Sequence, residues 1–362
     1  MSYKIRNKYD TLDTVMLGDT YHSQYFDTIK NDKIKSALKR IADETQEDLE
    51  NFQNVLKQFG CRVIRPELNK NDRIENNRVL KGIPRPPLQP RDAQFVMGNH
   101  LFVTGVGDSL DHPSIIERLL DYDDSVVEIM NDRSPYLDAP NWTINNNDLW
   151  VNNCEEHRFR DKETGETLHR FDIYDKTQYE SVLHRTIEAS EDALIKIKTL
   201  YPNLNINVLQ HEGHSDGCFA ILKDGAIITR VEIQNYKKNF PNYDICTVQD
   251  DQTDFRRELS FWKVTKHKAL TSFWLPGEED NHEFQEFVET WLEDWVGFVE
   301  ESIFDVNVLV LDEHNVCVSN PNNSVINSFF KKHNIEPIYV PWRHRFFWDG
   351  GLHCITLDLR RS

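Results

Sequence analysis

The strongest constraint on the fold is a β-hairpin signal that recurs along the chain. Apolar segments at 95–97 and 101–103 flank Gly98 and Asn99, a pair typical of tight hairpin turns. Three further pairs of short apolar segments flank residues 145–148, 223–225 and 312–315. A repeating unit of this size predicts radial pseudo-symmetry, with the hairpins arranged around one centre.

Helices and single strands are predicted between the hairpins. Apolar residues at helical spacing form two stripes: Leu183, Ile187, Leu194 and Ile197, and then Ile326, Phe329 and Phe330. A third, aromatic stripe from Phe284 to Val299 predicts a helix packed on the core, with Glu300 and Glu301 at its C-terminal end. Lone strands are predicted at 63–64, 205–209 and 338–340. With a first unit near 15–18 and a last one at Cys354, we expect five similar α/β units that converge on a polar channel.

Polar residues precede the predicted hairpins. They are Asp92, Asp138, His214 with Asp216, and Asn307. Pseudo-symmetry would bring these side chains together around the axis. The run from Gly350 through Gly351, Leu352 and His353 to Cys354 adds a thiol that two glycines allow the chain to present in a tight bend. One thiol, one imidazole and three carboxylates indicate nucleophilic catalysis on a cationic substrate.

Length and composition narrow the class of protein. The 362 residues contain no linker or low-complexity segment, so we expect one catalytic domain over 1–362. A net charge of −18 makes nucleic acid and anionic membranes unfavourable partners and favours cationic small molecules. The sequence contains neither a membrane-length apolar run nor an N-terminal signal pattern, and its six cysteines lack C-x-x-C spacing. These features predict a soluble protein of the reducing cytoplasm. A homodimer is a possible assembly.

Taken in order, the motifs resemble the arginine:glycine amidinotransferases of the guanidino-group-modifying superfamily. The resemblance covers most of the chain and is densest from Asn307 to Arg361. It rests on Pro90-Arg91-Asp92, Asp138-Ala139, His214-x-Asp216 and the Gly350 to Cys354 run. The resemblance implies an α/β fold, a five-bladed pseudo-symmetric α/β propeller known as the pentein fold.

The resemblance also implies roles for the site residues. Cys354 would be the nucleophile, His214 the general acid and base, and Asp138 its orienting or guanidinium-binding partner. Asp92 and Asp216 would bind the guanidinium, and Arg230 is the nearest candidate to hold an amino acid carboxylate. Carboxylates beside Cys354 should raise the pKa of its thiol, and substrate charge should lower it again. The implied activity transfers the amidino group of arginine to an amine and releases ornithine, with no cofactor.

The sequence departs from that family around the acceptor. Gly213 and His211 stand where relatives that use glycine carry a Met and an Asn, and Glu300 and Glu301 replace two small hydroxyl residues. Asn141 stands where the family has an Asp. These differences predict an amine acceptor longer than glycine.

Three alternatives remain open. An arginine deiminase-type hydrolase would use the same residues with water as the acceptor, and a non-catalytic guanidine-binding protein would keep the site without turnover. His211, His214, Asp216 and Cys218 could instead be metal ligands. On a strand, residues 214, 216 and 218 would share one face, but no second ligand cluster with a recognisable spacing accompanies them, so we expect no metal.

Overall fold

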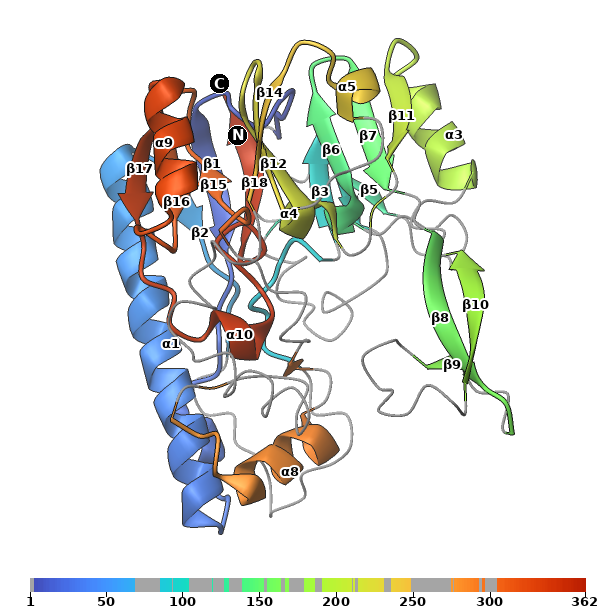
Figure 1. The fold of residues 1–362 in the computed structure, drawn as a ribbon. Helices are drawn as coiled ribbons and strands as arrows, with labels where there is room; N and C mark the ends of the chain where they lie inside the picture. Colours follow the sequence, from blue (N-terminus) through green and yellow to red (C-terminus); the bar gives the residue numbers. More distant parts are fainter. Residues whose placement is uncertain are drawn as a thin grey trace.

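Five three-stranded sheets with one topology form the body of the molecule. The computed structural model describes residues 3–68, 85–92, 94–103, 119, 127–129, 139–152, 155–163, 167–168, 179–185, 191–209, 211, 214–230, 236–248, 275, 277–292, 295–296 and 305–362. In each of the five sheets a central strand pairs antiparallel with one neighbour and parallel with the other. These sheets confirm the predicted five α/β units (Figure 1).

Each sheet combines a hairpin-like pair with a third strand from further along the chain, and we call each sheet a blade. The second to fifth blades are β3 (Gln94–Met97), β4 (His100–Val103) and β5 (Val127–Ile129); β6 (Trp142–Asn145), β7 (Asp148–Asn152) and β11 (Asn205–Leu209); β12 (Phe219–Lys223), β13 (Ala226–Thr229) and β14 (Asp244–Thr247); and β15 (Leu309–Val310), β16 (Asn315–Val318) and β17 (Glu336–Tyr339). Three of the four tight turns contain a residue in the left-handed region, Gly98, Asn146 or Gly225, as such turns require.

The first blade joins the two ends of the chain. Its strands are β18 (Thr356–Arg361), β1 (Leu12–Leu17) and β2 (Arg62–Ile64). β1 pairs antiparallel with β18 from Leu12 opposite Arg361 to Leu17 opposite Thr356. The segment before β1 continues to the second blade, where Ile5 bridges to Gly98. The last strand of the sequence is therefore held by the first.

The parallel third strands require crossover connections, and described helices lie in four of them. α1 (Asp32–Phe59) lies between β1 and β2, α3 (Glu191–Leu200) precedes β11, α5 (Tyr236–Asn239) precedes β14 and α9 (Ser324–Lys332) lies between β16 and β17. Asn31 caps the N-terminus of α1 and Gly60, at φ 104°, ends it. α1 runs along much of the height of the molecule, with the blades beside its upper part and α8 (His282–Trp291) against its lower part (Figure 1).

Two predicted helices differ from the structure. Leu183 lies in strand β10 (Tyr179–Arg185) and not in a helix, whereas Leu194 and Ile197 lie in α3, which is described from Glu191. Ile187 lies outside the described residues. β10 pairs with β8 (Glu155–Asp161), which also pairs with β9 (Thr167–Leu168), in a sixth, antiparallel sheet that the hairpin pattern did not predict. α8 ends at Trp291, because the chain leaves the helical conformation at Leu292 while Trp295 still packs in the core. Glu300 and Glu301 lie outside the described residues.

Candidate active site

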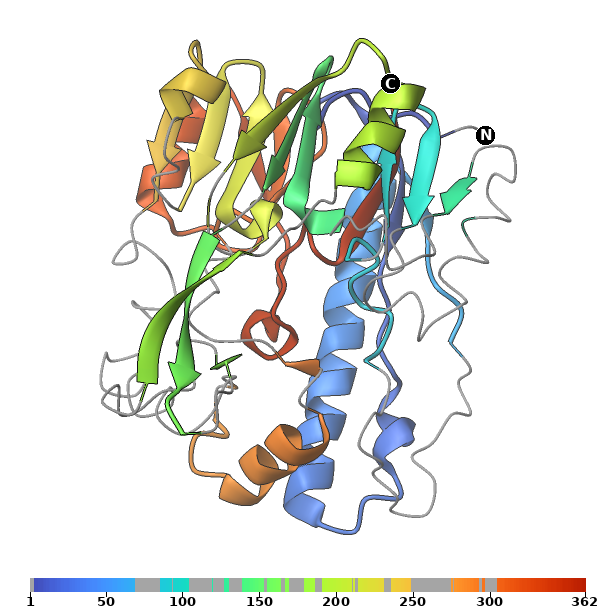
Figure 2. The ribbon, with the colours of Figure 1, turned by 90° about the vertical axis from the view of Figure 1, so that its right-hand side faces the viewer.

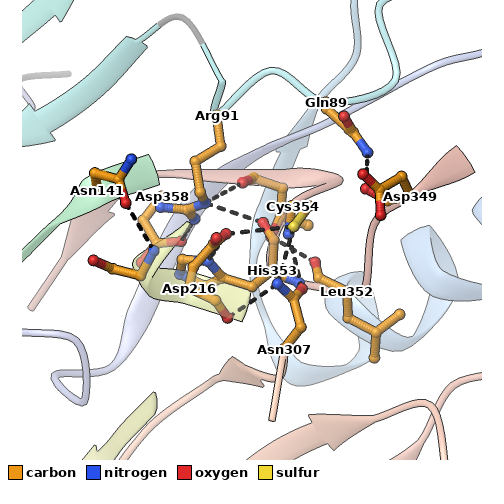
Figure 3. Close-up of polar contacts among 12 residues, drawn as sticks. Gln89, Arg91, Asn141, Asp216, Asn307, Asp349, Leu352, His353, Cys354 and Asp358 are labelled. Carbon is orange, nitrogen blue, oxygen red and sulfur yellow. Dashed lines mark hydrogen bonds and ion pairs between the residues drawn. The ribbon is translucent and has the colours of Figure 1, made fainter. Parts of the chain in front are cut away.

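The polar residues that precede the hairpins meet at one end of the blades. Cys354 lies two residues before β18, Asn307 two before β15 and Asp92 two before β3. Asp216 belongs to α4 (Ser215–Cys218), a single helical turn directly before β12. Figure 3 shows Asp216, Asn307, His353 and Cys354 pointing toward one another. The convergence predicted from pseudo-symmetry is present for these residues.

Asn307 holds the nucleophile in place. Its Nδ2 donates to the Cys354 Sγ at 2.9 Å and to the backbone oxygen of Asp216 at 3.0 Å. Its Oδ1 accepts from the backbone nitrogens of His353 at 2.9 Å and Cys354 at 3.1 Å. The side chain is buried. One amide thus fixes both the backbone and the sulfur of the nucleophile.

Asp216 lies beside the thiol. Its Oδ2 accepts from the His353 Nδ1 at 2.9 Å and lies 3.4 Å from the Cys354 Sγ. Its Oδ1 is buried and has no hydrogen-bond partner among the described residues. A buried carboxylate oxygen without a partner costs free energy, which a bound donor would recover.

The charges of this site are arranged for a cation. Burial raises the pKa of Asp216, but the hydrogen bond and charge of His353, with further contributions from His214 and Arg91, outweigh burial and hold that pKa below its usual range. Burial, assisted by the positive charge of Arg91, lowers the pKa of His353 to about 4 against the opposing effect of Asp216. At neutral pH the pair is therefore a carboxylate that accepts from a neutral imidazole, whose Nδ1 carries the proton.

The Cys354 thiol is protonated in the free site. Burial raises its pKa well above 9.0, the negative charges of Asp216 and Asp92 add to this, and hydrogen bonds from Gly351 and Asn307 oppose it. The predicted direction is confirmed, although burial rather than the carboxylates is the largest cause. Cationic charge bound beside Asp216 would reverse part of the shift.

Close approach of other side chains explains the glycine pair. Neither Gly350 nor Gly351 has a positive φ. A Cβ on Gly351 would lie 2.6 Å from the Cβ of Asn307, and one on Gly350 would collide with the side-chain nitrogen of Gln89. The glycines therefore make room for the residues that surround the nucleophile.

A buried ion-pair network supports the strand behind Cys354. Arg91 donates through Nη2 to Asp358 at 2.9 Å and through Nε to the backbone oxygens of His353 and Thr356. Asp358 also pairs with Arg361 at 2.9 Å, and Arg361 reaches the backbone oxygen of Val310 in the fifth blade. The sequence placed Arg91 beside Asp92 but gave it no role. Asp358 in the C-terminal motif is the signal that could have indicated the role of Arg91, because a buried carboxylate needs a cationic partner.

The segment before the nucleophile is anchored to α1. α10 (Arg345–Trp348) buries its aromatic side chains, and Trp348 donates from its indole nitrogen to the Thr45 hydroxyl at 2.9 Å. The indole nitrogen of Trp342 donates to the backbone oxygen of Gly350 at 2.7 Å. α10 lies below the blades, beside α1 (Figure 2). The loop that ends in Cys354 is thus held by the long helix as well as by the blades.

Several predicted site residues lie at the edge of this geometry. Asp92 is half-buried and acts on Cys354 through its charge, and His214 is exposed at the start of α4, where its charge is felt by Asp216. Arg230 follows β13, and its Nη2 lies 3.7 Å from the Cys218 Sγ. This contact places Arg230 beside Cys218, and its role in holding a carboxylate stays a prediction.

Asp138, Gly213, Glu300 and Glu301 lie outside the described residues. The turn that follows Asp138 is described: η3 (Ala139–Asn141) packs on α4, where the Asn141 Oδ1 accepts from the backbone nitrogen of Ser215 at 3.1 Å. Asn141 thereby positions the turn that carries Asp216.

The strand geometry that the metal-ligand alternative assumed for residues 214–218 is absent. Residues 215–218 form α4, so the alternation that would place three potential metal ligands on one face does not exist. The His211 Nε2 lies 3.1 Å from the Ser215 hydroxyl instead. Among the described residues, no three His, Cys, Asp or Glu side chains gather in a metal-binding group.

Comparison with known proteins gives the class to which this fold belongs. The amidinotransferase SxtG of the saxitoxin biosynthetic pathway of Microseira wollei superposes with a TM-score of 0.61 at 14% identity, covering 99% of this chain and 97% of that one. The inosamine-phosphate amidinotransferase StrB1 of Streptomyces griseus gives 0.60 at 15% identity, covering 100% and 98%. A dimethylarginine dimethylaminohydrolase gives 0.55 at 13% identity, covering 96% and 99%.

Sequence similarity to curated proteins is local. The mitochondrial glycine amidinotransferase of Xenopus laevis is 45% identical over 56 residues, which span 16% of this chain and 13% of that protein. No family model matches the chain.

The chain therefore has the fold of the amidinotransferase, or pentein, superfamily. The five mixed sheets are its five blades, as the resemblance implied. In the described part of the chain, no helix is long and apolar enough to cross a membrane.

Proposed function

We propose that the protein is an amidinotransferase that moves the amidino group of L-arginine to an amine acceptor. The observation that carries this proposal is the Asp216 Oδ1, a buried acceptor without a partner among the described residues, beside the thiol of Cys354. A guanidinium is a planar cation with five N–H donors, and a carboxylate is its natural partner. The fold shared with two amidinotransferases supports the same substrate class.

The proposed reaction has two halves. In the first, the Cys354 Sγ attacks the guanidino carbon, and a C–S bond replaces the bond from that carbon to the Nε of arginine. The thiol proton passes through His214 to that nitrogen. Ornithine then departs, and an amidino thioether remains on the enzyme. In the second, the acceptor amine attacks the same carbon and loses a proton to His214. The C–S bond breaks, and the sulfur recovers the proton.

Binding and activation would be coupled through charge. Asp216 and Asp92 hold the pKa of the free thiol high and at the same time attract the cationic substrate. Once the guanidinium neutralises them, the Asn307 amide at 2.9 Å from the sulfur favours the thiolate. The nucleophile would thus form where its target is already bound.

A hydrolase is the second candidate, favoured by the fold shared with dimethylarginine dimethylaminohydrolase. Mass spectrometry of products after incubation with arginine, alone and with a panel of amines, separates the two. The proposal expects a new guanidino compound, and ornithine beyond one equivalent of enzyme, only when an amine is present. Citrulline formed without an amine would show the hydrolase instead.

The acceptor proposal rests on sequence, because Gly213 and the Glu300-Glu301 pair are outside the described residues. We infer an amine longer than glycine, such as an amino alcohol, a diamine or an ω-amino acid. Gly213→Met should then depress activity with the long amine more than with glycine. A wild-type preference for glycine that Gly213→Met leaves unchanged would contradict this inference.

We also infer that residues 1–362 form one catalytic domain that works in the cytoplasm without metal or cofactor. Its turnover should survive dialysis against EDTA unchanged. Loss of turnover that an added metal restores would contradict this inference.

A further inference from the structure

Residues 85–92 form a rigid support beside residues 349–354, the nucleophile loop. Three of these eight residues are prolines, whose rings fix φ. The side chain of Leu88 is buried, and the backbone oxygen of Pro87 accepts from the Asp19 nitrogen at 3.0 Å. A Cβ on Gly18 would collide with the Leu88 backbone, so the segment lies directly on the chain that leaves β1. The first blade therefore holds this segment in place.

The Gln89 side chain of this segment contacts the nucleophile loop at a left-handed turn. The side chain is buried, and its Nε2 donates to the backbone oxygens of Trp348 at 2.8 Å and Asp349 at 2.9 Å. Figure 3 shows the bond to Asp349. Asp349 has a φ of 47°, which is uncommon for a residue with a Cβ. Gln89 therefore holds the left-handed turn that follows α10.

The two carbonyl groups that Gln89 contacts need donors from outside their own helix. α10 is a single turn, and the last carbonyl groups of a helix have no partner within it. A primary amide carries two N–H donors, which match two successive carbonyl oxygens. The Arg85 Nη2 donates to the same Trp348 oxygen at 2.7 Å. Residues 85–92 thereby supply the hydrogen bonds that the end of α10 lacks.

The same segment also holds the other end of the nucleophile loop and one acidic residue of the site. Arg91 donates through Nε to the backbone oxygen of His353 at 3.0 Å. The backbone nitrogen of Asp92 donates to the Gln89 backbone oxygen at 3.2 Å, and the charge of Asp92 acts on Cys354. One segment thus connects the position of the thiol to that of this carboxylate.

We propose that Gln89 is a positioning residue, which holds the left-handed turn at Asp349 so that the loop delivers the Cys354 sulfur to the Asn307 amide. Gln89 acts through the backbone of Asp349 and not at the reacting atoms. Without its two donors, the turn would lose hydrogen bonds that offset its unfavourable φ. The effect on the loop is independent of any substrate, whereas the effect on the reaction rate rests on the proposed function.

Hydrogen exchange measured by mass spectrometry tests the effect on the loop without turnover. The backbone nitrogens of His353 and Cys354 donate to Asn307, and they should exchange faster once the turn is released. Gln89→Met keeps the length of the side chain but removes both donors, so peptides within 349–356 should exchange about tenfold faster or more. Gln89→Asn keeps the amide but shortens its reach, and its effect should have the same direction. Wild-type protection of this loop in either variant would overturn the proposal.

Gln285→Met is the matched control. Gln285 is also buried, and its Nε2 donates to the successive backbone oxygens of Glu278 at 3.3 Å and Glu279 at 2.9 Å. The control therefore loses the same kind of paired hydrogen bond, but none of its atoms belongs to the nucleophile loop. Exchange of 349–356 should stay at the wild-type rate. Equal acceleration in Gln285→Met would show a general loss of stability and would overturn the role of Gln89.

Single-turnover kinetics then separates the position of the thiol from the amount of folded protein. At saturating arginine without an amine, Gln89→Met should form the Cys354 adduct about tenfold more slowly or more, because misplacing a reacting atom lowers the rate. The arginine concentration that gives half the maximal rate should stay within about twofold, since Asp216 lies on α4 and not on this loop. A merely structural defect would give less adduct at the wild-type rate.

The two measurements distinguish failure of this proposal from failure of the proposed function. A wild-type rate of adduct formation in a variant whose loop exchanges faster would overturn the positioning role. If the wild-type protein forms no adduct with arginine, the proposed function fails, and the exchange comparison still decides whether Gln89 holds the loop.

Discussion

At the scale of single residues, the side chain that organises the site is an amide. Asn307 makes four hydrogen bonds, to the Cys354 sulfur, to two backbone nitrogens of the nucleophile loop and to the backbone oxygen of Asp216. An asparagine supplies both donors and acceptors within one planar group. It can therefore hold a thiolate and the backbone that carries it at the same time.

Asn307→Ala should slow the reaction of Cys354 with iodoacetamide by about tenfold or more at pH 8, because a hydrogen bond to a charged group contributes about 1.5–3 kcal/mol. The bond lowers the pKa of the thiol, so its loss raises that pKa further. Alkylation followed by intact-protein mass gives the rate. Asn327→Ala, which removes an exposed asparagine side chain of α9 that donates to the Pro321 backbone oxygen, should leave the rate unchanged. Equal rates in wild type and Asn307→Ala would show that Asn307 does not activate the thiol.

Substitutions of His214 and Asp216 should affect kcat and KM differently. His214→Ala should lower kcat by about 10² or more, in the range of a general acid and base. Asp216→Asn should also raise KM for arginine, because guanidinium donors lose their charged partner. The control is Asp224→Asn, a carboxylate at the turn of the same blade. Near-wild-type values for His214→Ala and Asp216→Asn together would place the substrate elsewhere.

The sequence predicted those site residues whose side chains are themselves reactive or charged. A thiol after two glycines and carboxylates before hairpins stand out as reactive groups. Asp216 and Cys354 do meet, and Asp92 acts on the thiol through its charge. Asn307 was expected near the axis without a role, and the contact of His353 with Asp216 was not foreseen. Their functions depend on which backbone atoms and oxygens come within 3 Å, and spacing along the chain carries no such distances.

At the scale of elements, β18 links the site to the ring of blades. The side-chain carboxylate of Asp358 is 1% exposed between Arg91 and Arg361. Burial raises its pKa, but Arg361 and Arg91 outweigh burial and hold that pKa well below 3.8. Asp358 of the strand that follows Cys354 is therefore paired with Arg91 from outside the strand and with Arg361 of the strand itself.

Asp358→Asn should lower the free energy of unfolding by about 3–5 kcal/mol, because it leaves buried cations without their carboxylate. The folded-state pKa is depressed, so this stabilisation is present above the unfolded pKa of about 3.9 and is lost as pH falls below it. Urea unfolding at pH 7 and at pH 3.5 measures both effects, and the difference from wild type should shrink at the lower pH. Asp13→Asn, which removes a half-exposed pair with Arg360 on the same strands, should cost about 1 kcal/mol or less. A cost for Asp358→Asn no larger than this control would contradict the network.

Elements with a repeated local signal were predicted well, and single irregular ones were not. The four hairpins carry turn residues and apolar strands, so their order followed from the sequence. The turn Ser215–Cys218 is too short for any periodicity to separate a strand from a helix. Leu183 matched a helical stripe by spacing alone, although strand pairing with β8 decides its conformation.

At the scale of the whole molecule, ring closure places the nucleophile. β18 pairs with β1, and the segment before β1 bridges to the second blade, so both ends of the sequence lie in one wall of the propeller. Cys354 precedes the strand that closes this ring. The pseudo-symmetry read from the hairpins predicted this centre. The pseudo-symmetry did not predict the ion pairs around this centre, because the residues that form them belong to no repeat.

The central claim is that Cys354 carries the amidino group between donor and acceptor. Its most direct test is the intact-protein mass after incubation with arginine and no amine, followed by peptide mapping. We expect one amidino adduct on Cys354, absent in Cys354→Ala and discharged when an acceptor amine is added. Ornithine formation without any adduct, or an adduct on any of the other five cysteines, would contradict the account.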